Sequence, residues 1–168
     1  MDAAFDAVYR EYGGAVHGYL SRLTGDPSLA EELAQETFVR FLRHRSSIHG
    51  VNGTLGAWLF KVATNLARDR ARRRRQEPLP AEEARAPAGG DGLSAAEAQE
   101  VGERVRREVD RLPPELRGAF LLRAHHELPY EKVAAALGVC ERTAKERFRM
   151  AREILAHRLS PLLDEDRR

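Results

Sequence analysis

Five polar side chains in the last quarter of the sequence have types and a spacing that suit contacts with a nucleic acid. They are Arg142, Thr143, Lys145, Glu146 and Arg149. On a helix, positions 142, 145, 146 and 149 share one face. Arginine and lysine bind phosphates and guanine, and glutamate can accept a hydrogen bond from cytosine. The set predicts a helix face that contacts DNA; the alternative is a helical hairpin with a solvated basic face.

A second set of polar residues lies near the middle of the chain, at intervals of four, three and four. It comprises Lys61, Asn65, Arg68 and Arg72. These intervals form one stripe along a helix. Its cations suit a DNA backbone that crosses the helix, and the amide of Asn65 can donate to and accept from a base. From Arg68 to Arg75 there are six arginines and one aspartate, a block typical of nucleic-acid binding or of a solvated helix end.

Motifs for catalysis or metal binding fail on spacing. The histidine pair at 125–126, followed by Glu127, invites comparison with a zinc-protease motif, which needs a second histidine four residues after the first. The residues at those positions are Pro129 and Tyr130. The glycines of 89–92 are not followed by a lysine, and no nucleophile has a matched base. We therefore expect no metal, no cofactor and no enzymatic activity.

Bulk composition suits one or two small domains in a cytoplasmic protein. The chain has 168 residues, of which 42% are hydrophobic and 32% charged, with a net charge of +2. Cys140 is the sole cysteine, so no disulfide can form within the chain. The N-terminus is acidic and lacks the apolar stretch of a signal peptide. No run approaches the roughly 18 apolar residues of a membrane span, so we expect no membrane insertion.

Apolar residues at helical spacing predict three helices in a first domain, residues 1–75. The first helix carries an apolar stripe from Phe5 to Leu23, which includes Tyr9. Asp26 can cap the second helix, which begins with a proline and continues to about His44. After a polar loop, a third helix begins near residue 55 and ends in the arginine block.

Residues 76–93 are rich in proline and glycine and predict a flexible linker. Flexible-chain scaling gives this linker an end-to-end distance of roughly 25 Å. A second helical domain follows over residues 94–160, with a tail over 161–168. No segment alternates polar and apolar residues as a strand would. The predicted fold class is all-α, with two small helical domains and a helix-turn-helix in the second.

The helix-turn-helix pattern spans residues 128–155. Its first helix covers about 130–137, and Gly138 supplies the left-handed conformation that commonly ends a helix. The second helix covers about 141–158. Its buried stripe is expected to comprise Ala144, Phe148, Ala151 and Leu155. That stripe leaves the polar face described first on the outside, as a recognition helix requires.

The chain as a whole resembles bacterial sigma factors of the extracytoplasmic-function group, the two-domain members of the sigma-70 family. Residues 25–44 resemble the family's core-polymerase-binding helix, and residues 57–75 resemble its promoter-melting helix. Residues 112–152 resemble its domain for the upstream, minus-thirty-five element. The resemblance implies a protein that binds core RNA polymerase, directs it to specific promoters and assists promoter opening. It also implies promoter DNA and an anti-sigma factor as partners.

The resemblance further implies roles for three sets of residues. The polymerase-binding set is Glu31, Glu32, Gln35 and Glu36. The stripe that begins at Lys61, together with loop 46–54, holds the minus-ten element, and the face that begins at Arg142 contacts the upstream element. Cys140 stands where the family commonly has serine, which weakens the cap of the recognition helix. A redox role for Cys140 and a plain capping role are both open.

Two other functions compete with this interpretation. One is a stand-alone helix-turn-helix regulator that binds duplex DNA without polymerase. The other is an interaction protein whose helical domain docks on another protein. Residues 25–44 and 57–75 favour the sigma factor, because a simple repressor needs neither segment.

Overall fold

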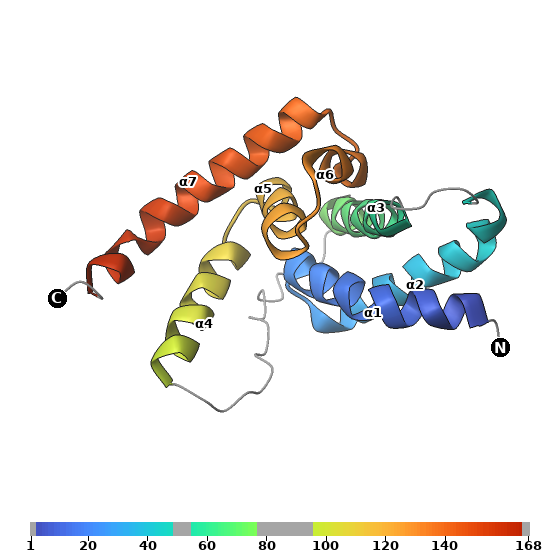
Figure 1. The fold of residues 1–168 in the computed structure, drawn as a ribbon, viewed down its shortest axis with the longest axis horizontal. Helices are drawn as coiled ribbons and strands as arrows, with labels where there is room; N and C mark the ends of the chain where they lie inside the picture. The colour runs from blue at the N-terminus through green and yellow to red at the C-terminus, as the bar shows by residue number, and fades with distance from the viewer. Residues whose placement is uncertain (1–2, 49–54, 77–95, 166–168) are drawn as a thin grey trace.

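The computed structural model describes residues 3–48, 55–76 and 96–165, and these residues are almost wholly helical (Figure 1). Residues 77–93 of the predicted linker 76–93 and residues 49–54 of the loop 46–54 lie outside the described residues, whereas Gln76 is helical. Within the described ranges no strand occurs, so the predicted all-α class is confirmed. None of the described helices is long and apolar enough to cross a membrane.

The first domain contains α1 (Ala3–Thr24), α2 (Pro27–His44) and α3 (Leu55–Gln76), with a short 3₁₀ turn, η1 (Arg45–Ser47), after α2. The start of α2 follows the prediction. Asp26 adopts an extended conformation, and its carboxylate accepts a hydrogen bond from the backbone N–H of Leu29 at 3.0 Å. Gly25, with φ of 69°, reverses the chain between α1 and α2.

The second domain contains α4 (Ala96–Asp110), α5 (Pro114–Phe120), the π-helical turn η2 (Leu121–His125), α6 (Tyr130–Leu137) and α7 (Glu141–Glu165). Helix α7 packs against α4, α5 and α6 (Figure 1). It continues to Glu165, into the segment expected as a tail, and its residues Leu155 and Leu159 pack in or against the core.

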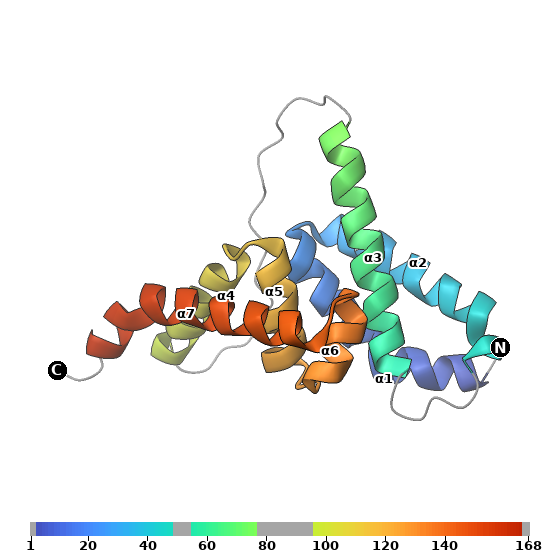
Figure 2. The same ribbon diagram turned by 90° about the horizontal axis from the view of Figure 1, so that it is seen from above.

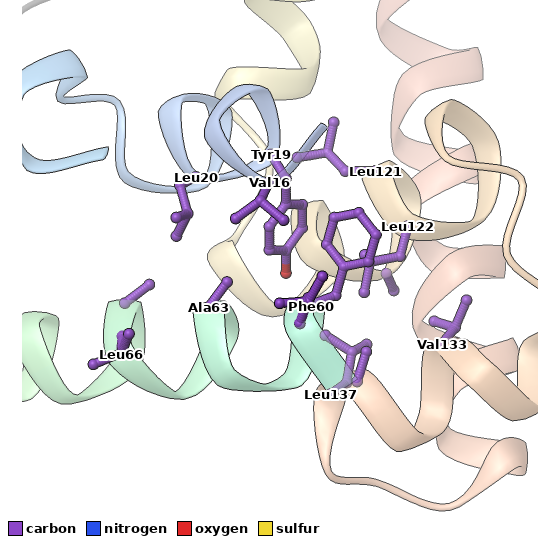
Figure 3. Packing of buried hydrophobic residues seen from close by; sticks show 14 of the residues in the cluster. Val16, Tyr19, Leu20, Phe60, Ala63, Leu66, Leu121, Leu122, Val133 and Leu137 are labelled. Carbon is purple, nitrogen blue, oxygen red and sulfur yellow. The ribbon is translucent and has the colours of Figure 1, made fainter. Parts of the chain in front are cut away.

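The two domains pack against each other, an arrangement that the sequence did not predict. Helix α6 lies against α3, as Figure 2 shows, and α5 contacts α1. The buried residues of both domains form one continuous hydrophobic cluster. Figure 3 shows its centre, where Tyr19 of α1 and Phe60 of α3 lie beside Leu137 of α6. Tertiary packing thus joins two helical units that are separate in the sequence.

Candidate nucleic-acid interfaces

The helix-turn-helix has the turn that the sequence predicted. Gly138 ends α6 in the left-handed conformation, with φ of 65° and ψ of 38°. The backbone N–H of Val139 then donates to the carbonyl of Ala134 at 3.0 Å, which closes the end of α6. Val139 packs partly buried against the core at the corner. This corner sets the angle at which α7 leaves α6.

The outer face of α7 is polar because its apolar stripe is buried. Ala144 and Ala151 are fully buried, and Phe148 stacks with Phe120 at a ring distance of 6.0 Å. Four of the five predicted upstream-element residues are exposed on the opposite side. They are Arg142, Lys145, Glu146 and Arg149. The structure therefore brings these four side chains onto one accessible face.

Thr143, the fifth residue of that set, does not share the exposed face. It is half-buried, and its hydroxyl lies 3.1 Å from the Cys140 thiol. Cys140 itself is exposed. The hydroxyl of Thr143 and nearby backbone N–H groups lower the pKa of this thiol, as expected at the start of a helix. Thr143 thus belongs to the helix start rather than to the outer face.

Ion pairs within α7 hold most of the cations on the outer face. Arg149 is paired with Glu146 at 2.6 Å and also contacts Glu153. Lys145 is paired with Glu141 at 2.7 Å. Hydrogen bonding from Arg149 lowers the pKa of Glu146, so this carboxylate stays charged. Exposed pairs of this kind are weak, so a phosphate can displace the carboxylates.

The central stripe lies on α3, as predicted. Lys61, Asn65 and Arg72 are exposed, and Arg72 pairs with Asp69 at 3.4 Å. Arg68 is different, because its guanidinium donates to the carbonyl of Leu137 in the other domain at 2.7 Å. All four members of the stripe are therefore exposed, and one of them, Arg68, is also bonded to the helix-turn-helix.

The predicted polymerase-binding residues lie on the outer face of α2. Glu31, Glu32 and Gln35 are exposed. Glu36 is half-buried and pairs with Arg40 one turn later at 2.9 Å. The structure thus places the four predicted side chains along one helix, with three of them fully accessible.

A small pocket beside this face adds residues that the sequence analysis did not assign to it. The pocket has a volume of about 170 Å³ and lies between α1 and α2. Tyr9, His17 and Gln35 are among its lining residues. Tyr9 is 55% exposed, although periodicity placed it on the buried stripe of α1. Its ring lies on the rim of the core, 4.9 Å from the ring of Phe38, so an apolar position at helical spacing did not ensure burial.

The histidine pair that resembled a metal motif lies in the contact between the domains. The ring of His126 is 4.8 Å from Phe60 of α3 and 6.2 Å from Tyr19 of α1. Burial, His125 and Arg22 lower the pKa of His126 to about 4. Within the described ranges, no group of three residues that could hold a metal ion is present.

Family comparison covers both domains. Residues 8–77 match the family model described as Sigma-70 region 2, and residues 102–155 match Sigma-70, region 4. A Pseudomonas aeruginosa protein, RNA polymerase sigma-H factor, is 30% identical over 96% of this chain and 89% of its own length. The chain belongs to the sigma-70 family, in its extracytoplasmic-function group.

Other relatives agree with that assignment. ECF RNA polymerase sigma factor SigE of Mycolicibacterium smegmatis is 34% identical over 90% of this chain, and this chain spans 60% of that protein's length. The solved structure of the sigma factor RpoE in complex with the anti-sigma factor NepR, from Bartonella quintana, has a TM-score of 0.79. It is 23% identical and covers 95% of this sigma factor and 98% of that chain, a likeness that shows the fold.

The two matched regions contain the three polar surfaces of this sigma factor. Region 2 contains α2 and α3, with the acidic face and the central stripe. Region 4 contains α6 and the part of α7 that bears the outer polar face. A sigma factor directs the catalysis of RNA polymerase and is not itself an enzyme, in agreement with the sequence analysis.

Proposed function

We propose that this sigma factor binds core RNA polymerase, directs it to specific promoters and assists promoter opening. One observation carries the proposal. Two separate helix faces, each rich in cations, lie on α3 and α7, inside the regions that match sigma-70 regions 2 and 4. A stand-alone regulator would need only the second face. The proposal places the protein in the cytoplasm, where RNA polymerase works.

Each surface takes a distinct role in this proposal. The acidic face of α2 binds the polymerase, and its exposed carboxylates suit a basic partner surface. On α3, Lys61 and Arg72 hold the DNA backbone, while Asn65 contacts a base of the minus-ten element. On α7, Arg142 and Arg149 contact the upstream element through the major groove. Glu146 limits which bases Arg149 accepts, because it competes for the same guanidinium.

We also propose an anti-sigma factor as a partner. Two solved structures similar to this chain are complexes of RpoE with the anti-sigma factor NepR and of CnrH with the cytosolic domain of CnrY. The second has a TM-score of 0.66 and is 23% identical over 97% of this chain and 89% of that chain. A protein that binds this chain and blocks its association with core polymerase would fulfil the role.

In vitro transcription tests the proposed function. Core RNA polymerase is combined with the full chain on fragments of genomic DNA, and the transcript starts are sequenced. We expect initiation from a defined set of promoters that share one minus-ten and one minus-thirty-five sequence. Initiation from none of them, combined with a footprint of the protein alone on duplex DNA, would establish a stand-alone regulator instead.

A further inference from the structure

The outer polar face of α7 carries a carboxylate between two arginines. Glu146 has 54% of its side chain exposed, and it lies on the same face as Arg142, one turn before it, and Arg149, one turn after it. Side chains three and four residues apart on a helix are neighbours. A DNA duplex that contacts both arginines therefore also meets the carboxylate of Glu146.

In the free chain, Arg149 occupies both oxygens of this carboxylate. The Nε and Nη2 atoms of Arg149 donate to Oε2 and Oε1 of Glu146 at 3.1 and 2.6 Å. The Nη1 atom of the same guanidinium contacts Glu153, one turn further along α7. Arg149 therefore has a second carboxylate that can hold it when Glu146 turns to another donor.

The two arginines keep Glu146 charged. Hydrogen bonding from Arg149, together with the positive charges of Arg149 and Arg142, lowers the pKa of the Glu146 carboxyl. A protonated carboxyl would carry a donor, whereas the charged form only accepts hydrogen bonds. The cations on either side also offset the repulsion between the carboxylate and the DNA phosphates. Glu146 thus meets a duplex as a pure acceptor.

A pure acceptor discriminates between the four bases in the major groove. Cytosine presents one amino donor there, N4, whereas guanine and thymine present only acceptors and a methyl group. Adenine presents an amino donor beside the N7 acceptor, which repels a carboxylate oxygen. A charged group that loses water without finding a donor is costly. Cytosine is therefore the base that the Glu146 carboxylate favours.

We propose that Glu146 is a specificity-determining residue, which selects a cytosine in the upstream promoter element. Its carboxylate accepts a hydrogen bond from cytosine N4, while Arg149 exchanges Glu146 for a neighbouring group of the duplex and stays in contact with Glu153. The inference rests on the proposed function, since α7 must lie in the major groove of the upstream element. It names the base that the position facing Glu146 contains.

Selection from duplexes with a randomised central window tests the base preference. The tagged full chain is mixed with the duplexes in the presence of core RNA polymerase, and the DNA that it retains is sequenced. We expect the wild type to enrich a sequence with cytosine at one position that depends on Glu146. Glu146→Gln should change that position to adenine, because a glutamine amide pairs with N6 and N7 of adenine. Glu146→Ala should leave that position without a preferred base and the other positions unchanged.

Glu153→Gln is the matched control. Glu153 is 60% exposed, contacts the same arginine as Glu146, and loses the same charge in this variant. We expect Glu153→Gln to retain the cytosine, and all variants to keep the helical circular dichroism of the wild type. Retention of the cytosine in Glu146→Ala would overturn the proposal. An equal loss of preference in Glu153→Gln and Glu146→Gln would also overturn it, because Glu146 would then act only through charge or through Arg149.

Affinity for the selected duplex measures the size of the effect. Exchange of the selected C·G pair for T·A should weaken binding by the wild type about fivefold or more, and binding by Glu146→Ala by less than about twofold. The comparison of two duplexes within one variant cancels the general gain in affinity that follows the loss of a negative charge. Fluorescence anisotropy with labelled duplexes, in the presence of core polymerase, is the measurement.

Transcription separates this inference from the proposed function. Upstream of the transcript starts of the holoenzyme, we expect the same cytosine that the selection enriches. Initiation from promoters without any base preference that depends on Glu146 would overturn the inference and leave the proposed function standing. A cytosine preference that depends on Glu146, without any initiation, would contradict the proposed function and leave the base contact standing.

Discussion

Arg142 and Arg149 occupy the same face of α7 but differ in their surroundings. Arg149 is held between Glu146 and Glu153, whereas Arg142 is exposed and forms no ion pair within the part of the chain that the structure describes. Arg142 is therefore ready to contact a base without first losing a partner. On the same face, Lys145 and Arg149 would each have to exchange a carboxylate for a DNA contact.

For Arg142→Ala, we expect upstream-element binding by the holoenzyme to weaken by between about fivefold and about 150-fold. This range corresponds to the roughly 1–3 kcal/mol of a base contact. Thermal stability should not change, because the side chain is exposed. Fluorescence anisotropy with a labelled promoter duplex measures the affinity. The control is Arg107→Ala, an exposed arginine on α4; an equal loss in the control would mean that Arg142 acts only through net charge.

We expect His126 to make the contact between the two domains sensitive to pH. Its Nε2 atom is buried without a hydrogen-bond partner, and its pKa is about 4 in the docked state against about 6.5 in water. The groups that face it include Tyr19 and Arg22 of α1 and His125 of η2. Burial raises the pKa of Tyr19 to about 12, so Tyr19 does not titrate in this range. The contribution of neutral His126 to docking is fully present above pH 6.5, and we expect it to be lost as the pH falls towards 4.

Between pH 7.5 and pH 5, we expect the open fraction of the chain to rise roughly tenfold, after allowance for partial solvent screening. His126→Phe keeps a ring beside Phe60 and removes the titrating group, so most of the rise should disappear. Energy transfer between a dye on Cys140 and a dye on Ser28→Cys, both at exposed positions, is the measurement. An unchanged pH profile in His126→Phe would assign the effect to His125, whose pKa burial also lowers.

At the scale of elements, the corner between α6 and α7 depends on one glycine. Gly138 has φ of 65°, a region that costs other L-residues about 1 kcal/mol or more. We expect Gly138→Ala to lower the free energy of unfolding by about that amount. Gly102→Ala, within α4, should raise it by up to about 1 kcal/mol through helix propensity. Urea denaturation distinguishes the two, and a Gly138→Ala variant as stable as the wild type would contradict the role of the turn.

The stripe on α3 is expected to act in promoter opening rather than in duplex binding. Asn65 is exposed and can present both a donor and an acceptor to an unpaired base. Asn65→Ala should leave duplex affinity unchanged and reduce promoter opening, measured by permanganate reactivity of unpaired thymines. Asn65→Gln retains the amide and should preserve part of the opening. Equal opening by the wild type and Asn65→Ala would refute this role.

At the scale of the whole molecule, one hydrophobic cluster spans both domains, so the free chain should unfold as a unit. Trp58 is the sole tryptophan and lies in α3, so its fluorescence monitors the first domain, while circular dichroism monitors all helices. We expect the two urea transitions to coincide in the wild type and in Gly102→Glu, and to separate in Gly118→Glu, where the added side chain would meet Tyr19 and Leu23 of α1. Separate transitions in the wild type would mean that the domains are not coupled.

The helices and their ends could be predicted from the sequence alone, because they depend on residues that are close together in the chain. Helical periodicity predicted α1, α2, α3, α6 and α7. The capping residue Asp26 and the turn residue Gly138 marked helix ends. These signals were readable because a helix and its ends depend on residues only a few positions apart. The exposed face of α7, with Arg142, Lys145, Glu146 and Arg149, followed from periodicity for the same reason. The exposure of Tyr9 did not, since it depends on how α1 packs against Phe38 of α2.

Only the tertiary structure decided that the two domains meet. Gly118, His126 and Arg117 have no local pattern that marks them as contact residues. Gly118 and Arg117 contact atoms of α1, which is about a hundred residues away in the sequence. His126 lies against a ring of α3. Such contacts depend on shape and on carbonyls left open at helix ends, which periodicity does not encode. The sequence by itself therefore predicted two polar helix faces, and only the fold placed the helix-turn-helix against the helix that carries the other face.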